Sequence, residues 1–385
     1  MDKTTSLRIK EYDFGDHTRH YLTLALSSFT TMEEIEKGCR ELYEYLKEKS
    51  IRIVFEKVFG KLEFKKNVKD IRKYLAEALK LELGPLSYLE GEPVCQAPVC
   101  SVTVYGISSD QGFVDFDYIH DKDNKIGTSY NILGTNYLHL YGLTCQDNEP
   151  KSTAQEYTSL FCRIQNCIVQ RGFTPGDIVR TWIYMDEIYE NYCNLNLARR
   201  EFFEKNNIGY SDTSDALPAS TCIGGKASNK STAAIDVFCI NKNGDYPEIT
   251  RMYNRLQNEA EGKDYLFGPT FARAKSIDYG THCEIQISGT ASIDETGSTV
   301  FLNDPYNQIK KTFLNVEALL KQKGMDFGDV CVSTCFLKER EYDDIFNNVL
   351  TELGLCGLFD TVVMGDVCRS DLLFEFDGIA IKKKI

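Results

Sequence analysis

The order of predicted helices and strands recurs three times along the chain, and this recurrence constrains the fold more than any other feature. In the last third, apolar residues at helical spacing from Ile309 through Phe313 to Leu320 predict a helix. The elements predicted for this copy are a helix over 304–324, a strand over 330–337, a helix over 342–353 and a strand over 371–381. The middle third repeats them as 153–171, 178–185, 188–206 and 231–240, and the first third, more faintly, as 31–49, 51–58, 68–79 and 100–107.

A β-hairpin is predicted ahead of each copy, and turn signals such as Phe14-Gly15-Asp16 and Asp278-Tyr279-Gly280 support two of the hairpins. The predicted hairpins cover 7–27, 113–143 and 267–293. Each third of the chain is therefore predicted to be a ββαβαβ unit of the α+β class. The predicted domains are 1–110, which is the most degenerate copy, 111–245 and 246–385, and the predicted linkers lie near 90–97 and 241–264.

The helix pair of such a unit covers only one face of its sheet, so the opposite face needs another partner. Three tandem copies can bury these faces against each other, which predicts an intramolecular pseudo-trimer with clefts between the copies. We expect this molecule to be a monomer or a weak oligomer. The alternative is three separate domains on linkers, and the shortage of long polar linkers counts against it.

The chain has 57 acidic and 44 basic side chains, which give a formal net charge of −13. Phosphate binding needs a field of the opposite sign, so the charge argues against nucleic-acid binding and RNA cleavage. A few arginines or lysines gathered locally could still hold a small anion. The 14 cysteines are scattered singly and predict reduced thiols in a cytoplasmic protein. We expect no membrane segment, because no apolar run approaches the roughly 18 residues that a span needs.

The sequence gives no support for a metal or a nucleotide cofactor. The five histidines show no metal-ligand spacing, and His17 and His20 are predicted to lie in a solvated turn. Neither a GxGxxG segment nor a Walker loop occurs. A Ser/His/Asp or Cys/His nucleophile set is not evident either, which disfavours covalent hydrolysis.

Strand alternation places Arg180, Trp182 and Tyr184 on one face of a predicted strand. A cation beside two aromatic rings would suit a flat, anionic ligand that contains a ring. The alternative is an arginine paired with a carboxylate beside two aromatic side chains at an interface.

Glu375 is predicted to lie on the face of the last strand opposite Phe374 and Phe376, together with Leu373 and Asp377. Loss of solvation beside an apolar side chain would raise the pKa of the Glu375 carboxyl and let it hold a proton near neutral pH. A general acid requires this property. The alternative is a glutamate on an edge strand that faces water.

Two neighbouring segments could contact a ligand. Phe267 and Gly268 begin a tight turn shortly before Arg273, and the small residues around Gly289 and Thr290 would let a ligand approach the backbone closely. A plain loop followed by a strand of small residues would look the same.

Several of these residues fall in motifs that resemble a known family. The repeated unit resembles the RidA (YjgF) superfamily, whose members are trimers with ligand sites between subunits. The stretch from about Tyr137 to Ala380 resembles the chorismatase family, in which RidA-like units are fused in one chain. The matching motifs are 179–184, 217–224, 267–269 with 271–274, 287–291 and 368–375.

The resemblance implies cleavage of chorismate to pyruvate and a hydroxybenzoate or cyclohexadiene diol, without a metal or organic cofactor. Glu375 would protonate the methylene carbon of the enolpyruvyl ether. Arg180 and Arg273 would hold carboxylates, and Trp182 or Tyr184 would line the ring. The implied substrate-binding set also includes Phe267, Gly268, Gly289 and Thr290.

Two positions resemble the branch of the family that forms 3-hydroxybenzoate. These are Gly289 and Cys368, where the diol-forming branch prefers alanine. The residues alone describe Cys368 as a small buried side chain with no adjacent histidine to activate it. The resemblance implies instead that its thiol relays a proton during aromatisation, which favours 3-hydroxybenzoate plus pyruvate as products.

Two other functions compete with this hypothesis. A RidA-type enamine or imine deaminase relies on an arginine in a Pro-Ala-Arg-Ser-like segment, and neither 217–220 nor 359–362 contains one. A non-catalytic binder of a small aromatic or keto acid would tolerate Glu375→Gln, whereas an enzyme would lose turnover and keep its affinity.

Overall fold

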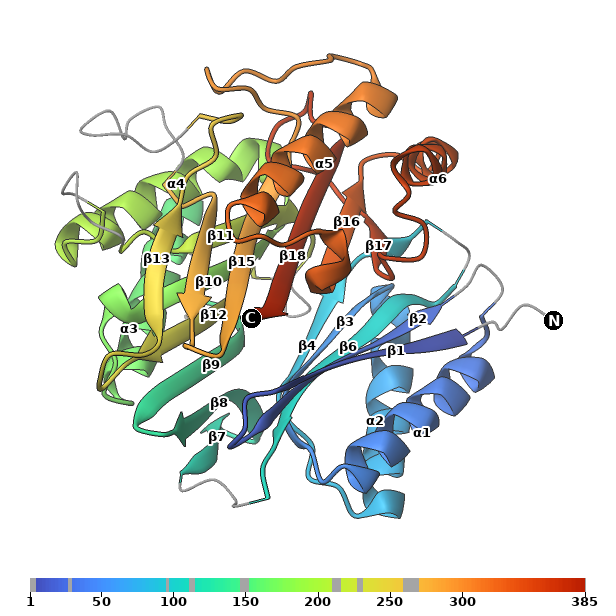
Figure 1. The fold of residues 1–385 in the computed structure, drawn as a ribbon, viewed down its shortest axis with the longest axis vertical. Coiled ribbons are helices and arrows are strands. Elements are labelled where there is room, and N and C mark those ends of the chain that lie inside the picture. Colours follow the sequence, from blue (N-terminus) through green and yellow to red (C-terminus); the bar gives the residue numbers. More distant parts are fainter. Residues whose placement is uncertain are drawn as a thin grey trace.

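The computed structural model contains three sheets with helices on their outer sides (Figure 1). It describes residues 5–26, 30–94, 97–110, 115–145, 152–209, 216–226, 231–258 and 270–384. We call each sheet with its two helices a unit, so that units 1, 2 and 3 hold the five-, six- and seven-stranded sheets. The predicted α+β class is confirmed.

The units follow one another along the chain. Unit 1 contains β1 (Thr5–Asp13), β2 (Thr18–Leu26), α1 (Met32–Glu48), β3 (Arg52–Gly60), α2 (Lys65–Leu79), β4 (Leu86–Glu90) and β6 (Val99–Ser108). Unit 2 contains β7 (Phe116–Asp121), β8 (Asn124–Ile132), β9 (Thr135–Leu143), α3 (Thr153–Val169), β10 (Ile178–Met185), α4 (Ile188–Lys205), β11 (Ala219–Gly224) and β12 (Ala233–Asn241). Unit 3 contains β13 (Glu248–Met252), β14 (Ala274–Asp278), β15 (His282–Ala291), α5 (Pro305–Lys321), β16 (Val330–Leu337), α6 (Tyr342–Leu353), β17 (Val362–Met364) and β18 (Phe374–Lys383), and β5 (Glu92–Pro93) joins its sheet.

Each unit has a strand after its second helix that the predicted ββαβαβ order lacks. The additional strands β4, β11 and β17 follow the second helix and pair in parallel with β3, β10 and β16. A helical crossover returns the chain in the same direction, so the short segment after the helix can add to the sheet in parallel. These strands are short, and that of unit 3 has only 3 residues, so they carry little alternation for a sequence pattern to detect.

Three predicted connections are corrected by the structure. The hairpin predicted over 113–143 is a three-stranded meander of β7, β8 and β9. The linker predicted over 241–264 contains β13, which pairs with β14. The linker predicted near 90–97 contains β5, which pairs with β17 of unit 3. The unexpected strands β7, β13 and β5 lie at sheet edges, where fewer side chains are buried and the apolar pattern is weak. The division into domains at residues 110 and 245 stays a prediction.

The helices form because each has one apolar face and a suitable first turn. In α1, Ile35, Leu42 and Leu46 are buried against the sheet, and Thr31 and Glu34 form a capping box at its start. The other helices bury apolar faces against their own sheets in the same way. No helix in the described part of the chain is long and apolar enough to cross a membrane.

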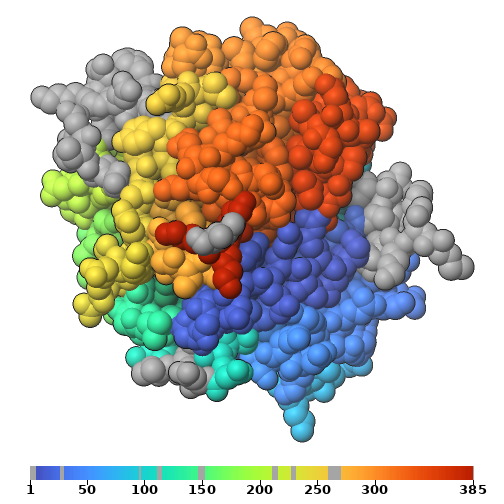
Figure 2. All heavy atoms as spheres, viewed as in Figure 1, coloured from blue at the N-terminus to red at the C-terminus, as the bar shows by residue number. Residues whose placement is uncertain are grey.

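The inner faces of the three sheets meet in a shared interior rich in aromatic side chains. Residues of all three units contribute to it, including Tyr105 from unit 1, Phe238 from unit 2 and Ile379 from unit 3. Figure 2 shows unit 1, in blue, lying directly against unit 3, in orange and red. The predicted pseudo-trimer is therefore confirmed, and the alternative of separate domains on linkers is wrong.

A buried ion pair joins the units inside this interior. Arg19 on β2 donates to Glu284 on β15 at 2.8 Å, and both side chains are 2% exposed. The guanidinium of Arg19 also lies 5.5 Å from the ring centroid of Tyr137 on β9, so one side chain contacts all three units.

His17 and His20 are also buried, so the prediction of a solvated turn is wrong. His17 lies beside Arg19, whereas His20 lies on the other face of β2, beside Tyr45 of α1. The elements that cover these side chains lie outside β2, and the sequence of the strand alone cannot show them.

Removal of the Glu284 charge should strongly destabilise the protein. Glu284→Gln leaves the Arg19 guanidinium buried without its counter-ion, and we expect a loss of about 3 kcal/mol in the free energy of unfolding, measured by urea titration. The control is Glu352→Gln, which breaks the exposed pair of Glu352 with Lys310 and should change stability little. Equal effects of the two substitutions would contradict the importance of the buried pair.

Candidate active site

Three junctions connect the units around the shared interior. At each junction, a strand of one unit contacts the first strands of the next unit. We name them junction 1–2, where β4 contacts β9, junction 2–3, where β11 contacts β15, and junction 3–1, where β16 contacts β2. A candidate site can therefore be compared with two related places in the same molecule.

The strand registers identify equivalent residues at the three junctions. In each unit, the strand after the first helix pairs with the last strand across a bulge at the same place. Counted from that bulge, Glu375 at junction 2–3 corresponds to Ser101 at junction 3–1 and Ala234 at junction 1–2. The hairpin registers likewise match Arg273 with Arg8 and Ile126, and the parallel strands match Ser220 with Asp360 and Leu86. At these matched positions, only junction 2–3 combines a glutamate with an arginine.

A pocket opens at junction 2–3 with about 390 Å³ of space not filled by protein atoms, including space open to solvent. Its walls come from α4 and β11 of unit 2 and from β15, β18 and neighbouring loops of unit 3. The lining residues are Tyr192, Arg199, Ser220, Cys222, Phe271, Arg273, Gly289, Ala291, Ile293, Cys368, Leu372 and Glu375. The structure thus brings together four residues that the sequence singled out, namely Glu375, Cys368, Arg273 and Gly289.

Glu375 is the acidic group of the pocket. Its side chain is 4% exposed. Burial, reinforced by the nearby charge of Asp377, raises the pKa of the Glu375 carboxyl to about 8, although Arg180 and Arg273 oppose the rise. At neutral pH the carboxyl therefore holds a proton, and the expectation that this glutamate faces water does not apply.

Gly289 makes room for this carboxyl. A Cβ atom at position 289 would lie 2.1 Å from Oε1 of Glu375 and 3.3 Å from Cγ2 of Thr221. Only glycine leaves the Glu375 carboxyl in its present place against the backbone of β15. The absence of a side chain at position 289 therefore leaves room for the Glu375 carboxyl, in addition to any room it leaves for a ligand.

Two arginines approach the pocket around Phe271. The Nε and Nη2 atoms of Arg273 donate to the carbonyl oxygen of Asn258 at 2.8 and 2.6 Å. Arg199 donates to the hydroxyl of Ser220 at 3.3 Å. The guanidinium carbons lie 5.3 Å (Arg273) and 5.8 Å (Arg199) from the Phe271 ring centroid. The pocket therefore presents positive charge to an anionic ligand.

Cys368 lies near the acid. Removal of the thiol from water and the nearby Glu375 carboxyl raise the pKa of Cys368 to about 12, although a hydrogen bond with Tyr192 lowers it. The thiol is consequently protonated at neutral pH. It can take part in a hydrogen-bonded proton transfer, and its high pKa disfavours a role as a thiolate nucleophile.

The face of Arg180, Trp182 and Tyr184 points into the shared interior, and these residues do not line the pocket. Arg180 donates to Asp377 at 3.0 Å and lies 4.9 Å from the centre of the Trp182 ring. The hydroxyl of Tyr184 accepts from Lys57 of unit 1 at 3.0 Å. These contacts match the alternative of an arginine paired with a carboxylate beside interface aromatics. A role in ligand binding stays a prediction.

The remaining predicted site residues differ in their placement. Thr290 is buried, and its hydroxyl donates to the carbonyl oxygen of Ser288 at 2.8 Å, away from the pocket lining. Phe267 and Gly268 lie outside the described residues. Sequence reasoning missed Arg199 and Tyr192, although Arg199 occupies a buried position on the apolar face of α4. A charged residue at such a position is a signal that could have been noticed.

The architecture and the site define a class: three related α+β units in one chain, with an acid and arginines at one junction. No family model matches the chain, and no curated protein matches its sequence. The structure is similar to a crystal structure of a chorismatase, with a TM-score of 0.59 and 14% identity over 98% of both chains. At this identity the likeness shows the fold.

Shorter solved structures match about a third of this chain. RidA from the bacterium Psychrobacter covers 34% of this chain with 98% of its own, at 18% identity and a TM-score of 0.27. A Rid-family protein of unknown function from Yersinia pestis covers 34% of this chain with 98% of its own, at 20% identity and a TM-score of 0.28.

Gly289→Ala should displace the acid without unfolding the protein. The new methyl group would overlap Oε1 of Glu375, so we expect the carboxyl to move by about 1 Å or more in a crystal structure of the variant. The end of a glutamate side chain can rotate away, so the melting temperature should fall by about 2 °C or less. An unmoved carboxyl, or a shifted β15 backbone, would contradict the packing described for Gly289.

Proposed function

We propose that this protein is a chorismatase-like enzyme that cleaves chorismate to pyruvate and 3-hydroxybenzoate without a cofactor. The observation that carries the proposal is the Glu375 carboxyl, whose pKa is raised to about 8 in a pocket that also holds Arg273. A protonated carboxyl beside fixed cations can donate a proton to a bound anion. The chorismatase fold over the full chain is consistent with this chemistry.

In the proposed reaction, Glu375 transfers its proton to the methylene carbon of the enolpyruvyl ether. The ether carbon becomes electrophilic, and the bond between the ring and the ether oxygen can break so that the pyruvyl group leaves as pyruvate. The oxygen of the neighbouring ring hydroxyl would bond to the ring carbon that has lost the ether oxygen, forming an epoxide. Reopening of the epoxide with this oxygen left at the 3-position, and loss of the proton from the same carbon, would give the aromatic product and return a proton to the site. Pyruvate and 3-hydroxybenzoate together have the composition of chorismate, so this route consumes no co-reactant, whereas formation of the diol consumes one water.

Arg273 and Arg199 would hold the substrate carboxylates in the proposed complex. Both are buried, and both line the same pocket as Glu375. Fixed cations in a poorly solvated pocket act more strongly on an anion than they would in water. Arg180 would act on the acid and not on the substrate. It pairs with Asp377, and its charge opposes the rise of the Glu375 pKa.

Cys368 would relay the ring proton during aromatisation. Its thiol lines the same pocket as Glu375 and interacts with Tyr192. A protonated thiol that can both donate and accept suits a relay between the ring and the carboxylate left after the first step. This role separates the aromatic product from the diol.

Incubation of the purified protein with chorismate tests the proposed function. Pyruvate is measured by a coupled assay and 3-hydroxybenzoate by chromatography, with heat-denatured protein as the blank. Glu375→Gln should lower kcat about 100-fold or more and leave the affinity for chorismate nearly unchanged. Because the protonated carboxyl is the donor, kcat of the wild type should also fall as the pH rises through about 8.

The outcomes of this experiment separate an enzyme from a binding protein. No pyruvate above the blank would reject the proposed function. Chorismate binding that is equal in wild type and Glu375→Gln, with no turnover in either, would indicate a non-catalytic binder.

Cys368→Ala should change the product rather than abolish cleavage. Without the thiol relay, we expect the ratio of 3-hydroxybenzoate to diol to fall by about tenfold or more. Cys193→Ala, which removes an exposed thiol from α4, is the matched control. An unchanged product ratio in Cys368→Ala would refute the relay.

A further inference from the structure

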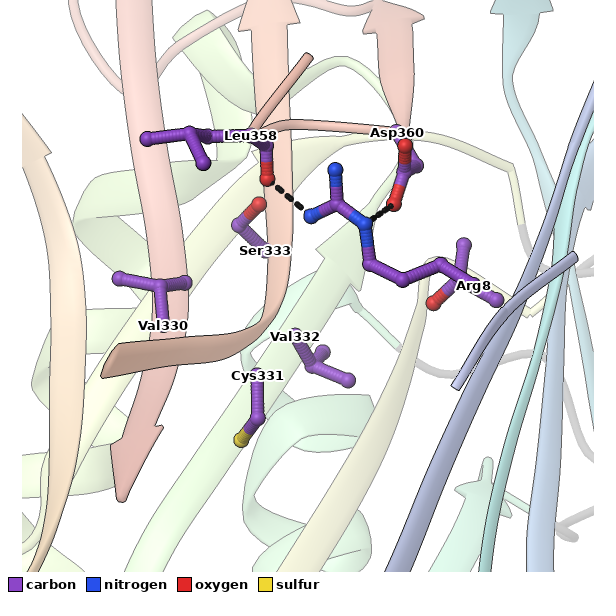
Figure 3. Close-up of a pocket in the computed structure, with 8 residues that line it drawn as sticks. Arg8, Val330, Cys331, Val332, Ser333, Leu358 and Asp360 are labelled. Atoms are coloured by element: carbon purple, nitrogen blue, oxygen red, sulfur yellow. Dashed lines mark hydrogen bonds and ion pairs between the residues drawn. The ribbon is translucent and has the colours of Figure 1, made fainter. Parts of the chain in front are cut away.

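Junction 3–1 contains a second, smaller pocket, shown in Figure 3. It has about 200 Å³ of space not filled by protein atoms, including space open to solvent. Arg8 and Thr23 of unit 1 line one side, and Cys331, Leu358 and Asp360 of unit 3 line the other. The pocket therefore lies between two units, as the candidate active site does.

The register of the hairpins shows that this pocket is built at the same place as the active-site pocket. Arg8 lies opposite Thr23 on the neighbouring strand, just as Arg273 lies opposite Ser288. Arg8 lies in the first strand of its hairpin, and Arg273 directly precedes the first strand of its own. Each arginine lines a pocket together with residues of the preceding unit. The pseudo-symmetry places a cation in each pocket at an equivalent position.

The two pockets differ in what lies beside the cation. At the position of Ser220 in the active-site pocket, junction 3–1 has Asp360. At the position of Glu375 it has Ser101, whose hydroxyl accepts a hydrogen bond from Thr361 at 2.8 Å. Junction 3–1 therefore keeps the cation, lacks the acid and adds a carboxylate.

That carboxylate is bound to the arginine. Nε of Arg8 lies 2.7 Å from Oδ2 of Asp360, with side-chain exposures of 23% and 17%. The two other guanidinium nitrogens of Arg8 donate to the carbonyl oxygens of Gly357 and Leu358. Figure 3 shows the Arg8 side chain reaching across the pocket to Leu358 and Asp360. All three arms of the guanidinium are thereby used within the protein.

We propose that junction 3–1 is a carboxylate-binding site that the chain's own Asp360 closes. Asp360 occupies the place on Arg8 that the carboxylate of a small ligand would otherwise take. The protein would then hold one open ligand site among its three junctions, and Asp360 would also link unit 3 to unit 1. The inference rests on the proposed function in one respect, which is that Arg273, the equivalent of Arg8, holds a substrate carboxylate. Its test requires no turnover of chorismate.

The test replaces Asp360 by the residue of the open junction. Asp360→Ser, made in the full chain, should melt about 3 °C below the wild type in sodium chloride, because Arg8 loses its counter-ion. Sodium acetate at the same ionic strength should raise the melting temperature of the variant by about 2 °C more than that of the wild type. Acetate is the probe because it is the smallest carboxylate with the shape of the removed side chain.

Two controls identify the site of acetate binding. Arg8→Met combined with Asp360→Ser should show no additional acetate effect, since the cation is gone. Asp121→Ala vacates Arg163 in a half-buried ion pair within unit 2, where side-chain exposures are 17% and 27%. An acetate effect in Asp121→Ala equal to that in Asp360→Ser would mean that any vacated arginine responds, and it would overturn the proposal.

The remaining outcomes also decide the question. An acetate effect that is the same in Asp360→Ser and the wild type would reject the closed site. If Asp360→Ser does not fold in chloride, refolding from urea into acetate but not into chloride would support the proposal. Failure to refold in either salt would show that no free carboxylate can replace Asp360, and would reject it.

Discussion

The structure depends on the burial of three sheet faces against each other. Each unit covers only the outer face of its own sheet with helices, so no unit can complete its core without the other two. Because the side chains of the shared interior are buried, a polar group among them needs a hydrogen-bond or ionic partner. Arg19 and Glu284 meet this requirement between units 1 and 3, and Lys57 and Asp236 do so between units 1 and 2, at 3.1 Å.

Because the three units are parts of one chain, the three junctions can carry different residues at equivalent positions. In a trimer of identical subunits, the same residues would occur at every junction. Here the position of Glu375 is held by serine at one other junction and by alanine at the third. All three units therefore have the same scaffold, whereas the acid is present at only one of the three matched positions. Burial at that position raises the pKa of Glu375.

The sequence predicts the repeated units and the residues that share a strand face. It does not predict the side-chain contacts that form between units. The recurrence predicted the units and the pseudo-trimer, and alternation singled out Glu375 before its pocket was known. The short strand β17 carries too few residues for a pattern, and the polar strand β13 lies in a segment whose composition predicts a linker. Whether Arg180 reaches a ligand or a carboxylate is decided by Asp377 of another unit, which no local pattern reveals.

The two-residue strand β5 has a consequence for how the chain can fold. It leaves the sequence of unit 1 and completes the sheet edge of unit 3 beside β17. These segments belong to the first and the last third of the chain, so their pairing closes a long loop and must await synthesis of unit 3. A segment made early in synthesis therefore stays unpaired until the last third of the chain has been made, although it lies in the first third of the sequence.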